Sequence, residues 1–186
     1  MLVEARISPI WKKQKLFISL FFMAIGAWFF RDGMVGYPRI NERWTEHDRF
    51  VKNQNLKEWP AYARSRGWVE EPPEKLYGRA DIIGQYVVGW IATILGILLL
   101  VYWFTQKGRL LQADDEAVIT ASGTRVPFDS ITSVNRQKWE SKGIARVRYS
   151  LDGRKGEFIV DDYKFDTDPT RQIFEKIEER LKAKKE

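Results

Sequence analysis

Apolar residues are concentrated in two stretches of the chain, and the second of these is the longer stretch without a charge. Residues 82–104 carry no formal charge, and a helix of these 23 residues, rising about 1.5 Å per residue, reaches across a hydrocarbon core of about 30 Å. Tyr102 and Trp103 lie where an aromatic belt is expected. A buried core helix is the alternative, but the rest of the chain has too little apolar material to surround one. The pattern predicts a membrane-spanning helix.

The first apolar stretch is shorter. It covers residues 16–30 and ends at Arg31, whose long side chain can reach the membrane surface, so that apolar residues beyond the charge extend the predicted helix to 16–36. A cleaved signal peptide is the rival interpretation, because Ala24 and Gly26 have the small-residue spacing of a cleavage site. The residues that follow would be an unusually bulky and apolar start for a mature protein, which favours an uncleaved anchor.

Basic residues near the ends of membrane helices favour the cytoplasm. Lys12, Lys13 and Lys15 form a compact group directly before the first helix. We therefore expect the N-terminal segment 1–15 and the C-terminal domain 105–186 to be cytoplasmic. Residues 37–81 are expected on the other side of the membrane, which we take to be a bacterial inner (plasma) membrane.

Small residues recur on one face of each predicted helix, where they allow two membrane helices to approach closely. They are Ser19 and Gly26 in the first helix and Gly89, Thr93 and Gly96 in the second. A dimer seam would use them, and so would the packing of both helices into a hairpin. The hairpin is favoured because one chain already supplies two helices.

The segment between the helices is too long for a simple connector. Residues 42–57 predict a polar helix, and a second short helix is expected from Trp59-Pro60 to a stop at Gly67. Aromatic side chains in this loop either pack on one another or form a docking surface for a partner or for lipid, and the residues concerned are Trp44, Trp59, Tyr62 and Trp68. The one His, His47, lacks the convergent ligands of a metal site.

Beyond residue 104 the pattern changes to short β-rich runs separated by turns. The predicted strands cover residues 109–112, 117–121, 125–128, 131–139 and 144–151, and a further strand holds Phe158 and Val160. Hairpin turns are expected at Ser122-Gly123 and Asp152-Gly153. Asp168 and Pro169 predict the start of a closing helix, whose apolar stripe should lie on the sheet.

This order of elements resembles the bacterial pleckstrin-homology-like (PH-like) domains. The resemblance covers residues 109–182 and rests on the acidic turn within Ala113 to Ile119, the glycine hairpin leading to Val126-Pro127-Phe128-Asp129-Ser130-Ile131, and the strand, hairpin and helix that follow. Such domains are often tethered directly behind two membrane helices. The resemblance implies a binding or assembly module and no catalytic residues, and the stretch is short for a seven-stranded barrel. The expected fold is thus a hairpin of two transmembrane helices plus a small α+β domain, with an antiparallel sheet or PH-like partial barrel and one C-terminal helix.

Little chemistry is visible in the sequence. The chain has no Cys, which excludes disulfides, thiolate nucleophiles and Cys-bound zinc. No glycine-rich phosphate loop and no pairing of a nucleophile with a base is visible, so we expect no enzyme activity, no catalytic residues, no cofactor and no metal. An acidic group near the last turn (Asp161, Asp162, Asp166 and Asp168) is more simply a helix cap and a solvated loop than a cation site.

The net charge of +6 suits contact with anionic lipid or nucleic acid. Nucleic acid is not expected, since the aromatic residues that would stack on bases lie mostly in the loop across the membrane. Six basic residues on neighbouring predicted strands and hairpins are candidates for contact with lipid or a protein partner, although they would also suit a solvated strand face: Lys138, Lys142, Arg146, Arg148, Arg154 and Lys155.

These observations favour a membrane-anchored, non-catalytic binding or scaffolding protein whose cytoplasmic domain contacts a protein or anionic lipid. The alternative is an accessory subunit of a larger membrane complex that docks through the Trp-rich loop. The sequence predicts the lipid bilayer as one partner and identifies neither a protein partner nor an oligomeric state.

Overall fold

A computed structural model describes residues 2–184 of the chain. The chain divides into two compact units. One is built from both ends of the chain, Met1–Phe17 and Leu100–Glu186, and the other is the central segment Ile18–Leu99. The fold is therefore α+β, with long helices and two small antiparallel sheets.

The first apolar stretch lies in a helix that begins earlier and continues further than the sequence predicts. Helix α1 (Pro9–Arg31) passes without a break through a π-helical turn, η1 (Asp32–Gly36), into α2 (Tyr37–Lys52). Gly33 is buried against the Tyr86 ring, and Pro38 is the second residue of α2, directly after the π-helical turn. The helix predicted over 42–57 is thus wrong in its bounds.

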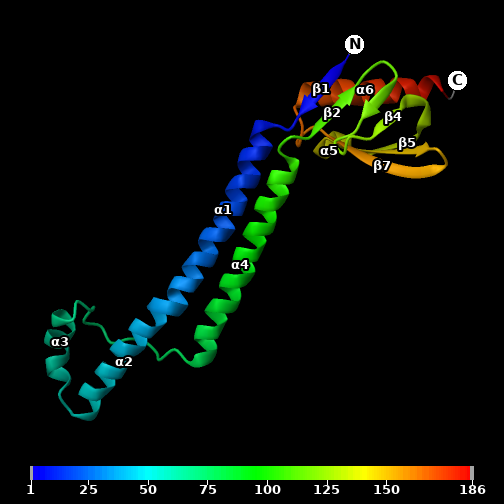
Figure 1. The fold of residues 1–186 in the computed structure, drawn as a ribbon. Helices are drawn as coiled ribbons and strands as arrows, with labels where there is room; N and C mark the ends of the chain where they lie inside the picture. Colours follow the sequence, from blue (N-terminus) through cyan, green and yellow to red (C-terminus); the bar gives the residue numbers. More distant parts are fainter. Residues whose placement is uncertain (1, 185–186) are drawn as a thin grey trace. The chain divides into compact units, whose positions relative to one another are not determined.

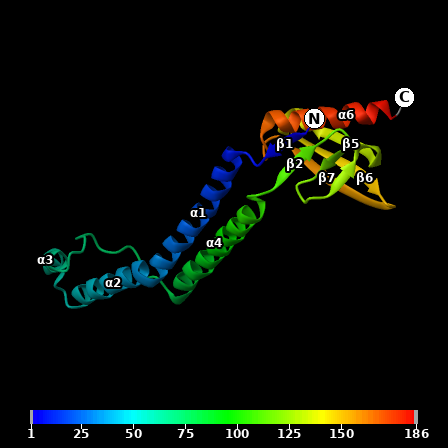
Figure 2. The same ribbon diagram turned by 45° about the horizontal axis from the view of Figure 1, so that its top comes forward.

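The remaining helices of the central segment agree with the sequence. A short 3-10 turn, η2 (Leu56–Glu58), precedes α3 (Trp59–Ser65), and Gly67 follows with a positive φ, as expected of a helix stop. Helix α4 (Arg79–Gln106) contains the second apolar stretch. Figures 1 and 2 show α1 and α4 side by side.

Both long helices, the continuous run Pro9–Lys52 and Arg79–Gln106, are long and apolar enough to cross a membrane by length and composition. Large apolar side chains are exposed along both, including Leu20, Trp28, Trp90, Ile94 and Leu98. Such a surface is unusual for a helix in water.

The sheet unit contains a strand that the sequence pattern does not predict. Strand β1 (Val3–Arg6) pairs antiparallel with β2 (Leu110–Ala113), and Ala5 lies opposite Leu111. Strands β3 (Ala117–Ile119) and β4 (Arg125–Pro127) complete a sheet of order β1-β2-β3-β4. The N-terminal segment is therefore part of the domain that was predicted for residues 105–186 alone.

The second sheet has the order β5-β6-β7 and is the more regular of the two. It follows the 3-10 turn η3 (Phe128–Ser130) and consists of β5 (Ile131–Lys138), β6 (Ile144–Leu151) and β7 (Arg154–Asp161), with the four-residue helix α5 (Trp139–Lys142) between the first two. Asp152 and Gly153 both have positive φ, which confirms the tight β6–β7 hairpin.

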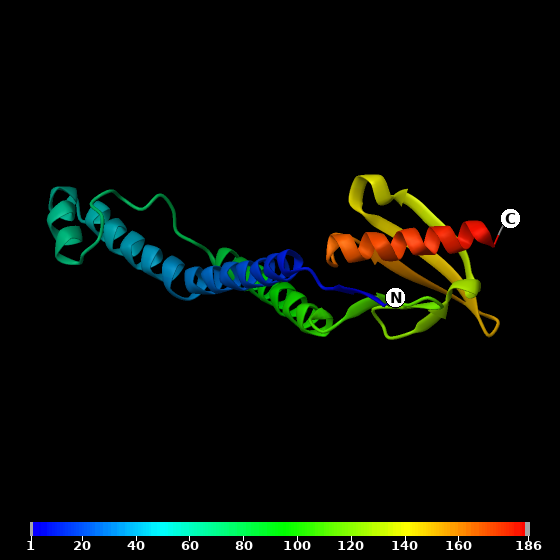
Figure 3. The ribbon, with the colours of Figure 1, turned by 90° about the horizontal axis from the view of Figure 1, so that it is seen from above.

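Helix α6 (Thr167–Ala183) closes the domain and contacts both sheets. Figure 3 shows it running along them. Its predicted apolar stripe is confirmed, since Ile173, Phe174 and Ile177 are buried in one core with Val118, Val147 and residues of the other strands. The predicted N-cap Asp168 is wrong: Asp166 precedes the helix, and Asp168 lies in its first turn. The two sheets do not close into a barrel.

Candidate functional site

The outer face of the β5-β6-β7 sheet carries most of the basic residues that the sequence singled out. Ala145 and Val147 are buried, whereas Arg146 and Arg148 are exposed, as the alternation predicts. Arg146 lies opposite Ile159, and Arg148 lies opposite Glu157. Directly paired residues project from the same side of a sheet, so these side chains share one face.

The carboxylate of Glu157 partly neutralises this face. Glu157 lies 3.2 Å from Nη1 of Arg146 and 3.4 Å from Nε of Arg148. Lys138 joins the two arginines in lining a shallow hollow, together with Asn135, Gln137 and Ile144. Three of the six predicted contact residues are therefore brought together.

The other three predicted contact residues lie elsewhere. Lys155 pairs with Ser150 and so shares the outer face, but it lies towards the β6–β7 hairpin. Arg154 lies at the same hairpin opposite Leu151. Lys142 belongs to α5 at the other end of β6. We call Lys138, Arg146, Arg148, Lys155, Glu157 and Ile159 the outer strand face.

The predicted aromatic docking residues of the loop contact one another. The Trp59 ring lies 6.2 Å from Tyr62 and 6.3 Å from Trp68, and Tyr62 lies 5.1 Å from Phe50. Trp59 is only 3% exposed, and its indole N–H donates to the carbonyl oxygen of Glu70 at 2.6 Å. Three of the four predicted docking residues thus form a small core.

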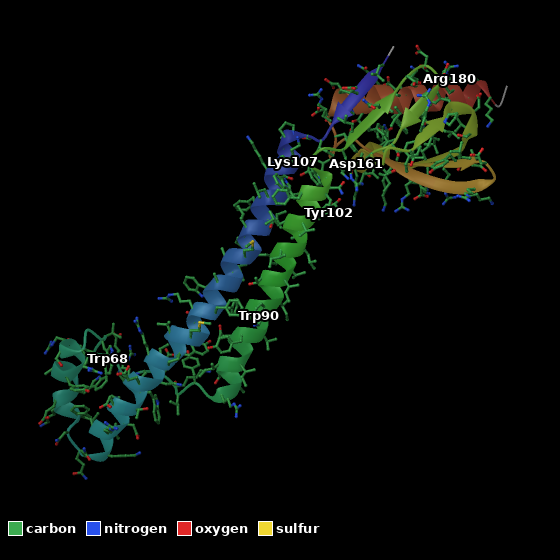
Figure 4. The ribbon with its side chains drawn as sticks, viewed as in Figure 1. Trp68, Trp90, Tyr102, Lys107, Asp161 and Arg180 are labelled. Atoms are coloured by element: carbon green, nitrogen blue, oxygen red, sulfur yellow. The ribbon has the colours of Figure 1, made fainter. Side chains whose placement is uncertain are left out.

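Trp44 differs from the other loop tryptophans. It is half-buried on α2, and within residues 2–184 it makes none of the ring contacts that join the loop aromatics. Figure 4 shows the position of Trp68 beside α2 and α3.

The small residues of α1 and α4 face each other within the central segment. The Ser19 hydroxyl donates to the carbonyl oxygen of Gly96 at 2.8 Å. A Cβ atom added to Gly26 would lie 3.0 Å from the carbonyl oxygen of Gly89 and would overlap Thr93. These contacts support the hairpin use of the small residues.

The close approach of Gly33 to α4 predicts that a pair of introduced cysteines would form a disulfide between the two long helices. A Cβ atom at Gly33 would lie 3.3 Å from Cβ of Gln85, close to the separation that a disulfide requires. We expect Gly33→Cys with Gln85→Cys to crosslink within one chain upon mild oxidation, read as a shift on a non-reducing gel. Since the chain has no Cys, the background is clean. Gly33→Cys with Val87→Cys, whose side chain is exposed, serves as the control that should not crosslink. Crosslinks only between two chains would contradict the hairpin.

A second cluster of basic and aromatic residues was not predicted as a site. It lies in the sheet unit, where the first turns of α1 meet the last turns of α4. Trp11 is buried and contacts Tyr102 edge-to-face at 6.1 Å, and the indole N–H of Trp103 donates to the carbonyl oxygen of Lys12 at 3.0 Å.

Three ammonium groups lie over these indole rings. Nζ of Lys15 and Nζ of Lys164 are 5.8 Å and 5.6 Å from the centre of the Trp11 ring, and Nζ of Lys107 is 5.6 Å from that of Trp103. Lys164 is half-buried and also donates to Oε1 of Gln106 at 2.8 Å. Burial lowers the pKa of Lys164, the nearby Arg109 lowers it further, and Asp161 opposes both effects.

The signal that could have revealed this cluster is the alternation of the first residues. Val3, Ala5 and Ile7 are apolar, and Glu4 and Arg6 between them are charged, which is the period of a half-buried strand. The strand brings Ile7 into a β-bridge with Phe165, and Ser8 donates its N–H to the carbonyl oxygen of Lys164 at 2.9 Å.

Two of the four acidic residues near the last turn have structural partners. Asp161 accepts the N–H groups of Tyr163 and Lys164, and Asp162 pairs with Arg171 at 3.1 Å. Among residues 2–184, no group of three or more potential metal ligands is found.

No family model, no curated protein and no solved structure matches the chain.

Proposed function

We propose that the chain is a two-pass membrane protein that holds a non-catalytic binding domain at one membrane surface. The observation that carries this proposal is the pairing of β1 with β2. Strand β1 leads into α1, and β2 follows α4. Two strands of one sheet must lie on the same side of a membrane, so the chain between them crosses it an even number of times. Two apolar helices of sufficient length provide two crossings.

The same pairing argues against cleavage of a signal peptide. Cleavage near Gly26 would remove Ala5, Ile7 and Trp11, each of which is buried in the core of the sheet unit. The lysines before the first apolar stretch favour a cytoplasmic location for both ends and for the sheet domain. A bacterial inner membrane suits this arrangement.

A PH-like identity of the domain is part of the proposal. The described residues hold seven strands followed by a C-terminal helix, and the strand that residues 105–186 lack is supplied by the N-terminus. This count agrees with the seven strands that the resemblance implies. A PH-like fold carries no catalytic motif, which is consistent with a binding module.

The outer strand face suits a protein partner. Glu157 neutralises part of the positive charge of Arg146 and Arg148. The attraction of this face to an anionic lipid surface is therefore weaker. Ile159 is 47% exposed on the edge strand β7 of this face, opposite Arg146. An exposed apolar residue beside charged ones suits a small protein interface.

The alternative, an accessory subunit that docks through the Trp-rich loop, is favoured by a different set of residues. Trp59, Tyr62 and Trp68 are engaged within the loop, but Val51, Leu56 and Val69 around them are exposed. These residues would form the docking surface of the loop.

One pair of matched variants separates the two candidates. Ile159→Asp and Val51→Asp each place a charge at an apolar residue that is about equally exposed (47% and 45%), so neither should unfold the protein. After solubilisation in mild detergent, we expect a stoichiometric partner to be lost with Ile159→Asp and kept with Val51→Asp. Loss with Val51→Asp alone would favour the loop, and no effect of either variant would contradict both surfaces.

A further inference from the structure

Four cations gather at the junction of β1, α1 and α4 without a matching number of acids. They are Lys15, Lys107, Arg109 and Lys164, and none of them forms a salt bridge within the described part of the chain. Asp161 is the acid that acts on Lys164, and its carboxylate is already engaged by two backbone N–H groups. We call these four residues, with Trp11 and Trp103, the tryptophan collar.

The collar lies where the apolar stretches end. Residues 16–30 and 82–104 are uncharged, Lys15 directly precedes the first stretch, and Lys107 follows the second after two polar residues. Figure 4 shows Tyr102 and Lys107 at the end of α4. Tryptophan is enriched at the ends of membrane helices, at the level of the lipid headgroups.

The contacts of the collar hold its cations in place. Each of Lys15, Lys107 and Lys164 has its ammonium group over an indole ring, and Lys164 is fixed further by Gln106. Arg109 donates from Nε to the carbonyl oxygen of Thr105 at 3.2 Å, which leaves its terminal nitrogens for another acceptor. Cations that are positioned in advance and outnumber the acids beside them attract an anion.

We propose that the tryptophan collar binds the phosphate group of an anionic phospholipid. This inference rests on the proposed insertion of α1 and α4 in a membrane. It assigns lipid recognition to the ends of the helices and leaves the outer strand face to a protein partner. The headgroup phosphate accepts from Lys15, Lys107, Arg109 and Lys164, while the acyl chains lie along the exposed apolar faces of the two helices.

The test measures lipid retention by the full chain. The protein is purified in mild detergent and titrated with phosphatidylglycerol or phosphatidylcholine, and bound lipid is counted by native mass spectrometry. We expect phosphatidylglycerol to be preferred. The triple variant Lys15→Gln, Lys107→Gln and Arg109→Gln should weaken its binding by about five-fold per charge, or roughly a hundred-fold in all. Lys164 is left unchanged because it is half-buried.

The matched control removes three charges from the outer strand face. Arg146→Gln, Arg148→Gln and Lys155→Gln should leave phosphatidylglycerol binding within about two-fold, because charges away from the collar act only through screened, long-range attraction. Circular dichroism verifies that both variants are folded. Soluble glycerol phosphate tests whether a free anion suffices, and we expect it to compete poorly.

Three results would overturn the inference: equal loss of lipid in both triple variants, no loss in the collar variant, or glycerol phosphate binding as tightly as the lipid. None of these three results would contradict the proposal that the chain spans a membrane. Release of the wild-type chain from membranes by an alkaline carbonate wash would instead contradict the membrane proposal itself.

Discussion

Replacing Ile7 with Ala is expected to lower the free energy of unfolding of the sheet unit by about 2–5 kcal/mol. Ile7 is 2% exposed, and it forms the β-bridge to Phe165 that holds the N-terminal segment against the turn before α6. Truncation of the side chain removes buried apolar contacts and leaves a cavity in a well-packed core. Pulse proteolysis of the full chain in membranes or detergent measures the effect.

Leu2→Ala is the control for this prediction, because Leu2 is 56% exposed. We expect a change within about 0.5 kcal/mol. A stronger form of the test uses fragments. Residues 105–184 alone should not fold cooperatively, whereas the same fragment with residues 2–13 attached through a flexible linker should. A fragment 105–184 that unfolds as cooperatively as the linked one would show that β1 is dispensable.

The second large loss of stability is expected from replacing Trp59 in the loop between the two long helices. Trp59→Ala removes a nearly fully buried side chain, its hydrogen bond to Glu70 and its contacts with Phe50, Tyr62 and Trp68. Such a truncation is expected to cost about 3–5 kcal/mol. A loop of this size has a small core, so we expect the variant to lose the ordered loop. Trypsin cleavage at Arg64 and Arg66, which are exposed, reports the opening.

Trp44→Ala is the matched control within the same loop. Because Trp44 is half-buried and stands apart from the ring cluster, we expect its replacement to destabilise the loop by about 1 kcal/mol. Equal rates of cleavage in both variants would mean that Trp59 is not the centre of the loop core.

The local pattern of apolar and polar residues predicted the elements that are stabilised by residues close in sequence. The alternation in β6 and the Asp152-Gly153 turn are both confirmed, because a hairpin brings together residues that are close along the chain. The uncharged run within α4 and the apolar stripe of α6 were likewise visible in the sequence.

Elements that depend on distant partners were harder to predict. Strand β1 has four residues, and its partner β2 begins at Leu110, so the pairing could not be derived from local pattern. The continuous helix through Gly33 was also missed. Two glycines and a proline favour a break, but the π-helical turn accommodates them, and Gly33 lets α1 approach Tyr86 closely.

The residues of the candidate sites likewise divide into those that local pattern predicts and those that depend on distant contacts. The sequence identified Arg146 and Arg148 as members of one exposed face, and strand period alone was sufficient for this. Glu157 is also among the acids expected to neutralise part of this face, but its shared pairing with Arg146 and Arg148 depends on the register of β6 with β7, which the sequence pattern does not give. The sequence did not predict the tryptophan collar, because its residues come from three separate parts of the chain.

The central claim is that two membrane crossings separate the loop from a domain that uses both ends of the chain. Single cysteines at Leu2, Ser65 and Ser122, all exposed, report it directly in a chain with no Cys of its own. In sealed membrane vesicles of known orientation, an impermeant maleimide should label Leu2→Cys and Ser122→Cys from the same side. It should label Ser65→Cys only from the opposite side. Labelling of Leu2→Cys and Ser122→Cys from opposite sides would contradict the account.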